Sequence, residues 1–270
     1  MQSIRQPISR LGESAIATVS FIGALGVLIG LTFAASPRLV VTRRGGRLAW
    51  KNLWFQLYRV GVRSIGVVML VTFAIGVILS LQIVPILDQY GAGDQIATII
   101  GIAFFRELGP LVGAIVLTGF AGASIAAEIG TMAVNEELKA LRSHAISPVR
   151  FLVVPRVLAS MVMTTCLAVL SSAMGIAGGM LATRMIIGMP YDAYLDLTFN
   201  SVEALDIVTG LIKAAVFGVL IGALACHLGL AVRGGASGVG NATTRTVVIS
   251  IVALTVVDLG FTAVFYMLGL

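Results

Sequence analysis

The 270-residue sequence contains little charge: Asp, Glu, Lys and Arg make up 11% of it, whereas 58% of its residues are hydrophobic. A soluble globular chain is roughly one quarter charged. The shortage of charge excludes an ordinary soluble domain and predicts an integral membrane protein. No cleavable signal peptide is recognisable, because the first apolar run is long and no small-residue cleavage site leads into a soluble domain.

Residue types that build chemical sites are also scarce. The chain has two cysteines, Cys166 and Cys226, and two histidines, His144 and His227. Both cysteines lie in apolar runs and form no C-x-x-C pair, so we expect small core residues rather than a disulfide or a metal site. The glycine-rich segment 233–245 lacks the Gly-Lys-Ser/Thr ending of a phosphate loop, and we expect a flexible turn there.

What the sequence has instead is long runs without charge. They cover residues 14–37, 64–87, 108–127, 157–183, 214–232 and 246–270, the last with Asp258 as its one charge. Each reaches or approaches the roughly 20 residues that a helix needs to cross about 30 Å of hydrocarbon. Because backbone polar groups in lipid must be satisfied internally, the predicted fold class is an all-α integral membrane protein.

Basic residues assign the two sides of the membrane. Segments 38–63, 128–156 and 233–245 are rich in Arg and Lys, so we predict that they face the cytoplasm. The alternate loops are acidic and should face outward; their acids are Asp88, Asp94, Asp192, Asp196, Glu203 and Asp206. This alternation accounts for the net charge of +6 without nucleic acid.

The N-terminal region does not fit a simple count of spans. If the run 14–37 crossed the membrane, Arg5 and Arg10 would lie outside, against the positive-inside rule. We therefore expect residues 1–63 to form an interfacial or re-entrant elbow in the cytoplasmic leaflet, followed by a five-span permease domain over residues 64–270. The N-terminus would be cytoplasmic and the C-terminus external. A full sixth span is the alternative.

A charged insert separates the second and third expected spans. It predicts a cytoplasmic helix of about three turns, capped by Asn135. Acids precede bases along this helix, which suits its dipole, and leucines share one face. The residues concerned are Glu136, Glu137, Leu138, Lys139, Leu141 and Arg142. Pro155 should break or kink the chain before the third span. An ordinary loop helix resting on the membrane explains the pattern equally well.

Five further charges lie in or next to the expected spans. Arg106 and Glu107 precede the uncharged run 108–127, and could contact a head group or partner, or simply snorkel outward. Glu128 ends that run on the inner side, where it could position the charged helix or mark the interface. Counting about 1.5 Å per residue from the span ends places Lys213 and Asp258 at one depth. Since a lone charge there is costly, we predict an intramembrane pair that is structural or gates the outer end of the path.

From about Gln56 onward the sequence resembles the MlaE-type permease family, the membrane subunits of ATP-binding-cassette (ABC) lipid transporters associated with mammalian-cell-entry (MCE) proteins. The matching segments are QLYRVGVRS (56–64), FRELGPLVGAIVLTG (105–119), AAEIGTM (126–132), SPVRFLVVPRVLA (147–159), LIKAAVFG (211–218) and GVGNATTRTVVIS (238–250), followed by Asp258. The resemblance implies a homodimer in the bacterial inner membrane that moves phospholipid or a related lipid. It also implies cytoplasmic ATPase subunits, which would hold the ATP and Mg, an MCE protein on the outer side, and no cofactor on this chain.

The resemblance also gives the charged insert a role, that of a coupling helix docked into the ATPase. Three positions depart from the family. The family often has acids at the positions of Lys139 and Arg142, so the contact with the ATPase stays undecided there. The family often has arginine at the position of Phe120, so a role in binding the lipid head group stays undecided there.

Two other functions remain as alternatives to a lipid permease. A secondary transporter usually shows repeated halves with broken helices, and no such repeat is recognisable. A membrane-embedded enzyme of lipid metabolism needs converging acids, bases or metal ligands, whereas the ionisable residues expected inside the membrane are essentially Lys213 and Asp258.

Overall fold

The computed structural model describes residue 16 and residues 19–35 and 46–269. Within these ranges the chain is almost entirely helical and contains no strand. Five helices are long and apolar enough to cross a membrane: Trp50–Gln89, Gln95–Val134, Val149–Ile187, Ala204–Leu230 and Gly235–Leu268. The predicted all-α membrane fold with five spans is therefore confirmed.

Most of these spans are built from several consecutive elements. The first consists of α2 (Gly46–Leu57), the π-helical turn η1 (Tyr58–Val62) and α3 (Ile65–Gln89). The second consists of α4 (Gln95–Ala103), η2 (Phe104–Leu108), α5 (Gly109–Leu117), η3 (Thr118–Gly122) and α6 (Ala123–Val134). The others, with the two short connecting helices, are α7 (Glu137–Ser143), η4 (Val149–Val153), α8 (Val154–Ile187), α9 (Tyr191–Ser201), α10 (Ala204–Leu230) and α11 (Gly235–Leu268).

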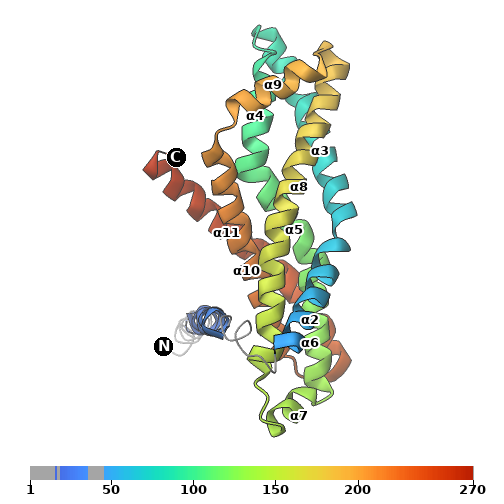
Figure 1. The fold of residues 1–270 in the computed structure, drawn as a ribbon, viewed down its shortest axis with the longest axis vertical. Helices are drawn as coiled ribbons and strands as arrows, with labels where there is room; N and C mark the ends of the chain where they lie inside the picture. Colours follow the sequence, from blue (N-terminus) through green and yellow to red (C-terminus); the bar gives the residue numbers. More distant parts are fainter. Residues whose placement is uncertain (1–15, 17–18, 36–45, 270) are drawn as a thin grey trace, which may run out of the picture.

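The helices form an elongated bundle with α8 near its middle (Figure 1). The short helix α7 closes one end of the bundle, and α9 closes the other. Segments 128–156 and 231–234 lie toward the end that carries α7, the α7 end, and the acidic loop 90–94 lies at the α9 end. The basic and acidic connections thus lie at opposite ends, as the charge pattern predicts; which end faces the cytoplasm stays a prediction.

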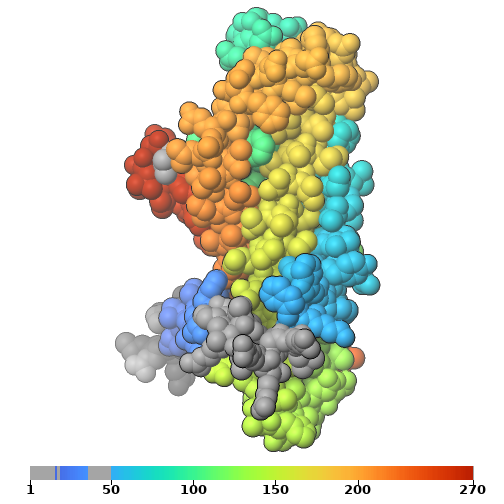
Figure 2. Space-filling model, in the orientation of Figure 1, coloured from blue at the N-terminus to red at the C-terminus, as the bar shows by residue number. Residues whose placement is uncertain are grey.

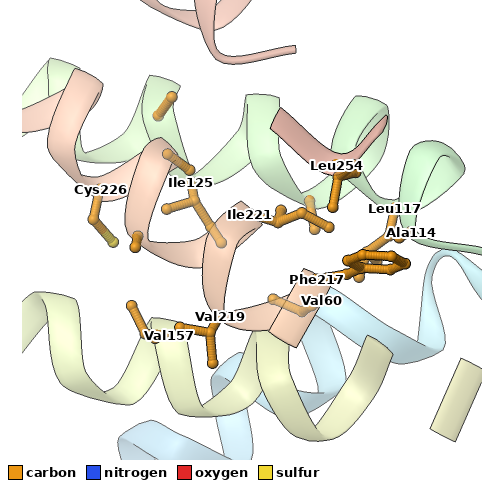
Figure 3. Close-up of a cluster of buried hydrophobic side chains, with 14 of the residues drawn as sticks. Val60, Ala114, Leu117, Ile125, Val157, Phe217, Val219, Ile221, Cys226 and Leu254 are labelled. Carbon is orange, nitrogen blue, oxygen red and sulfur yellow. The ribbon is translucent and has the colours of Figure 1, made fainter. Parts of the chain in front are cut away.

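The main core lies where α10 packs between α5–α6 and α8. Figure 3 shows Phe217 and Ile221 of α10 facing Leu117 and Ile125, with Val157 of α8 on the other side, and all five side chains are buried. Lipid tails are as apolar as these side chains, so close contact rather than hydrophobicity must hold such helices together.

The contact between α3 and α8 depends on glycine. A Cβ added to Gly76 would lie 2.0 Å from the Gly175 carbonyl oxygen, and one on Gly178 would lie 2.2 Å from that of Phe73. No larger residue fits either position without moving a backbone. The first and third spans therefore touch backbone to backbone, as small-residue interfaces in membranes allow.

Every span is longer than the uncharged run that predicted it. The second begins at Gln95 rather than at residue 108 and continues to Val134, so its charged residues lie within the helix and not at its ends. The last begins at Gly235, which makes most of segment 233–245 helical rather than a flexible turn. The turn is limited to residues 231–234, where Gly234 supplies a φ of 90° that other residues rarely adopt.

Four π-helical turns interrupt the long helices without breaking them. Each accommodates one extra residue in the helix, a device often found at functional positions. Pro155 follows η4 directly and lies in the first turn of α8, where its missing N–H costs little. The expected break or kink before the third span is therefore replaced by a π-helical turn and a continuous helix.

The N-terminal part that the structure describes is one apolar helix, Val19–Ala35, which is shorter than the five spans. Figure 1 shows this helix nearly end-on, so it lies across the bundle, toward the α7 end. Its Leu28 is buried against the main core, and the Phe21 ring meets the edge of His227 at 5.0 Å. Arg5 and Arg10 lie outside the described residues, and the elbow stays a prediction.

The predicted boundary between an elbow and a permease domain falls at residues 63 and 64. In the structure this boundary lies inside the first span, Trp50–Gln89. The segment immediately before the boundary therefore belongs to the same helical run as the segment after it.

Candidate functional site

A network of charged side chains lies between α10, η2 and α11. Lys213 of α10 is 1% exposed, and its Nζ lies 2.6 Å from Glu107 Oε1 and 3.1 Å from Asp258 Oδ1. The Lys213 ammonium also donates to the Thr262 hydroxyl at 3.0 Å, and that hydroxyl donates to Glu107 at 2.9 Å. The contact to Asp258 has ion-pair distance without hydrogen-bond geometry. We call Glu107, Lys213, Asp258 and Thr262 the Lys213 network.

The sequence analysis placed Lys213 and Asp258 at one depth, and the structure brings them into contact. It did not anticipate Glu107 as the closer carboxylate of the two. Glu107 lies in η2, about 18 Å along the second span from Gln95 at about 1.5 Å per residue, and Lys213 lies about 14 Å from Ala204. A buried ammonium is costly without partners, and two carboxylates and a hydroxyl here supply them.

A second ion pair adjoins the Lys213 network. Arg106 Nε donates to Asp206 Oδ1, and the Asp206 side chain is 3% exposed. The same carboxylate accepts the backbone N–H of Glu203 at 2.9 Å and thereby closes a capping box at the start of α10. Asp206 was predicted to belong to an acidic outer loop. In the structure it lies in the first turn of α10, next to that loop, where it caps the helix and pairs with Arg106.

The two ion pairs line a pocket of about 150 Å³. Its walls are Arg106, Glu107, Thr209, Lys213, Thr262, Phe265 and Tyr266. The charged groups come from η2 and α10, whereas α11 supplies the Thr262 hydroxyl and, near its end, the two aromatic rings. The pocket can thus contact both an anionic or hydroxyl-bearing group and an apolar chain. Among the described residues no three His, Cys, Asp or Glu side chains converge as metal ligands would.

Glu128 is the centre of another charge cluster, toward the α7 end. Its Oε2 lies 2.8 Å from Arg59 Nη1 and its Oε1 lies 2.9 Å from Arg156 Nη2. Arg156 is 3% exposed and also donates to the carbonyl of Leu152 at 2.9 Å. Because these residues lie on η1, α6 and α8, Glu128 links the first three spans. Glu128 lies in α6, the helix next to α7, and among the described residues it makes no hydrogen bond or ion pair with α7.

The charged helix α7 projects at one end of the molecule (Figure 2). It has seven residues, about two turns rather than the expected three. Asn135 ends α6 instead of capping α7, and Glu136 precedes α7 with a left-handed φ of 59° that turns the chain sharply. Glu136 accepts a hydrogen bond from Lys139 at 2.6 Å, and this bond lowers the pKa of Glu136.

The side chains of α7 divide into two faces. Leu138 is buried against the rest of the protein and Leu141 is half-buried. The exposed face is charged and carries Glu137, Lys139 and Arg142, with Glu136 immediately before the helix. Leu138 therefore holds α7 in place, while the charged face is free to meet another molecule.

Comparison with known proteins bears directly on this arrangement. The family model described as "Permease MlaE" matches residues 53–264, which include three of the five spans completely and most of the first and last. The chain belongs to the MlaE permease family. A probable ABC transporter permease protein of Rickettsia typhi is 35% identical over 239 residues, covering 88% of this chain and 91% of its own.

Two relatives come from photosynthetic organisms. A probable ABC transporter permease protein of Synechocystis is 35% identical over 209 residues, which cover 77% of this chain and 80% of its own. The chloroplast protein TRIGALACTOSYLDIACYLGLYCEROL 1 of Arabidopsis thaliana is 34% identical over 221 residues, covering 82% of this chain and 63% of its own. This MlaE-family chain is therefore a permease subunit of an ABC transporter and not an enzyme, and ATP hydrolysis belongs to a separate chain.

Proposed function

We propose that this permease subunit moves phospholipid or a related lipid, driven by ATP hydrolysed on its partner. The pocket beside Lys213 is the observation that carries the proposal. It offers two cations, one carboxylate and hydroxyls together with two aromatic rings inside an otherwise apolar bundle. A lipid has the same two-part chemistry. The Arabidopsis relative, which bears the name of a glycolipid, adds support.

The transport proposal is tested with the permease and its co-expressed ATPase in liposomes. We expect movement of a fluorescent phospholipid that requires ATP and is blocked by vanadate. Movement that continues without the ATPase, driven by an ion gradient, would instead identify a secondary transporter. Chemical conversion of the lipid would identify an enzyme. Mass spectrometry of lipids that co-purify with the complex would identify the lipid class.

The ATPase, in this proposal, binds the exposed charged face of α7. Leu138 is unsuitable for testing it, because the side chain is buried and its loss would disturb α7 itself. Reversing two exposed charges, Glu137→Lys with Arg142→Glu, should instead reduce co-purification of the ATPase while the melting temperature stays unchanged. The matched control is Asp196→Lys, an exposed reversal at the α9 end. Equal ATPase yield in all three proteins would remove α7 from the interface.

Two further partners complete the proposal: a second copy of the chain and an MCE protein on the outer side, in a bacterial inner membrane. In support of a homodimer, α11 is the least covered of the five spans, and Val248, Val252 and Val256 form an exposed apolar stripe along it. Cysteine placed at Val252 should cross-link two copies in the membrane, whereas cysteine at the lipid-exposed position Leu70 should not.

A further inference from the structure

A small pocket lies between the π-helical turns η1 and η3, well away from the Lys213 network. Its volume is about 80 Å³. The lining residues come from α2 and η1 on one side and from η3 and α6 on the other: Gln56, Arg59, Val60, Arg63, Phe120, Ala121, Ser124 and Ile125. The pocket thus combines two guanidinium groups, a hydroxyl and an amide with an apolar rim.

The charge around this pocket is unbalanced. Arg59 is paired with Glu128 and donates to the Ser124 hydroxyl at 3.3 Å. The buried Arg156 shares the same carboxylate. In the part of the chain that the structure describes, the Arg63 side chain has no ion pair and no hydrogen bond. Two arginines therefore share one carboxylate, and the exposed Arg63 adds a free guanidinium on the pocket wall, so three positive charges are balanced by one negative charge in and beside the pocket.

The pocket also contains an unsatisfied acceptor. Gln56 is 2% exposed, and its Oε1 has no hydrogen-bond partner among the described residues. A buried acceptor without a donor is costly, so a ligand that brings a donor is favoured. A ligand for this pocket should thus present an anion to the arginines and a hydroxyl or ammonium group to Gln56.

The position of the pocket indicates where such a ligand would come from. Trp54 and Tyr58 of the same helical run are 59% and 58% exposed, and amphipathic rings of this kind favour the membrane–water interface. Basic pockets between membrane helices on the cytoplasmic side bind anionic lipid head groups. The volume suits a phosphate group, while Phe120 at the rim is partly exposed and can meet the first carbons of an acyl chain.

We propose that this pocket binds the phosphodiester of an inner-leaflet phospholipid whose head group carries a hydrogen-bond donor. Arg63 and Arg59 hold the phosphate, since guanidinium groups match phosphate oxygens geometrically. Gln56 accepts from the glycerol hydroxyl of phosphatidylglycerol or the ammonium of phosphatidylethanolamine. Phosphatidylcholine lacks such a donor and binds less well. This inference does not depend on which lipid the permease transports.

The experiment measures lipids retained by the purified full-length protein, using native mass spectrometry with added phosphatidylglycerol or phosphatidylcholine. Arg63→Gln should weaken phosphatidylglycerol binding by about tenfold, the size expected for a lost charge-assisted hydrogen bond. Gln56→Met should lower phosphatidylglycerol binding to the level of phosphatidylcholine and leave phosphatidylcholine unchanged. The control Arg150→Gln removes an exposed arginine near the same end but outside the pocket, and should have no effect.

Several results would overturn the proposal. One is unchanged phosphatidylglycerol binding in Arg63→Gln, and another is an equal loss in Arg150→Gln, which would reveal unspecific attraction. Displacement of the lipid by millimolar inorganic phosphate would reveal a general anion site instead. If Arg63→Gln proves unstable, Arg63→Lys serves in its place: it keeps the charge but loses the forked geometry, and should still bind phosphatidylglycerol more weakly than the unaltered protein.

Discussion

The Lys213 network yields a quantitative prediction for stability. Replacing Lys213 by Met leaves Glu107 and Asp258 close together without their cation. Removing one partner from a buried ion pair costs roughly 3–5 kcal/mol. One kcal/mol corresponds to about 2–4 °C in a protein of this size class, so the melting temperature of Lys213→Met should fall by roughly 6–20 °C.

The Glu107 and Asp258 carboxylates should contribute unequally to the stability of the fold. Glu107 accepts hydrogen bonds from both Lys213 and Thr262, whereas Asp258 contacts Lys213 at ion-pair distance only. Glu107→Gln should therefore destabilise the protein more than Asp258→Asn, although Glu107 is the more exposed of the two. Lys213→Met leaves two carboxylates without a cation, whereas either carboxylate variant leaves Lys213 with one carboxylate. The triple neutral variant should therefore regain much of the stability that Lys213→Met loses.

The assay is thermal unfolding of the purified protein in one fixed detergent, with each variant compared against the unaltered chain. Residues that act as a unit show coupling of roughly 0.5–3 kcal/mol in a double-mutant cycle. Combining Lys213→Met with Glu107→Gln should accordingly cost less than the sum of the two single changes. Strictly additive losses, or a larger effect from Asp258→Asn than from Glu107→Gln, would refute the geometry described for the network.

Further predictions concern groups outside that network. Glu128→Gln should lower the melting temperature by several degrees, because Arg156 then keeps a buried charge without a carboxylate; an unchanged melting temperature would contradict this. Tyr194→Phe should be neutral or stabilising, since the buried Tyr194 hydroxyl has no partner among the described residues, and a clear loss would count against this. Burial also raises the pKa of Tyr194, so stability should fall as pH rises above about 10, where tyrosine in the unfolded chain ionises. An absorbance titration should show that Tyr194 stays protonated while the chain is folded. Lys139→Met should return the lowered pKa of Glu136 toward its ordinary value, which an NMR titration can measure. The exposed Glu136–Lys139 pair adds a small amount to the stability of the fold at pH values above the ordinary pKa of Glu136. This contribution is lost as pH falls through the lowered pKa.

The sequence was sufficient to predict the broad architecture. Uncharged runs identified five spans, and basic and acidic connections separated to opposite ends, because both signals are local in the chain. The depth of Lys213 and Asp258 could be estimated because the rise of a helix per residue is constant. The sequence carries no local signal for the direction in which a side chain points around the helix axis. The π-helical turn η2 changes this direction for Glu107, whose side chain faces Lys213.

The predicted span boundaries were wrong for a related reason. A charge was taken to end a span, yet Arg106 finds its partner 100 residues away at Asp206. Whether a charge is tolerated inside a bundle depends on such distant partners. One local signal was available: Glu203 and Asp206 have the spacing of a capping box, which marks a helix start rather than an open loop.

The four π-helical turns have a consequence for changes in chain length. In a regular α-helix each residue turns the chain by about 100°, so removing one residue from a span normally misdirects every side chain beyond it. Within Thr118–Gly122 the extra residue is already present, and Gly119 there faces open space. Removing Gly119 would therefore convert η3 to ordinary α-helix and leave α6, with Glu128 and the approach to α7, close to its present orientation relative to α5. At η3 the second span can thus lose one residue and keep the rotational register between the Lys213 network and the charged face of α7.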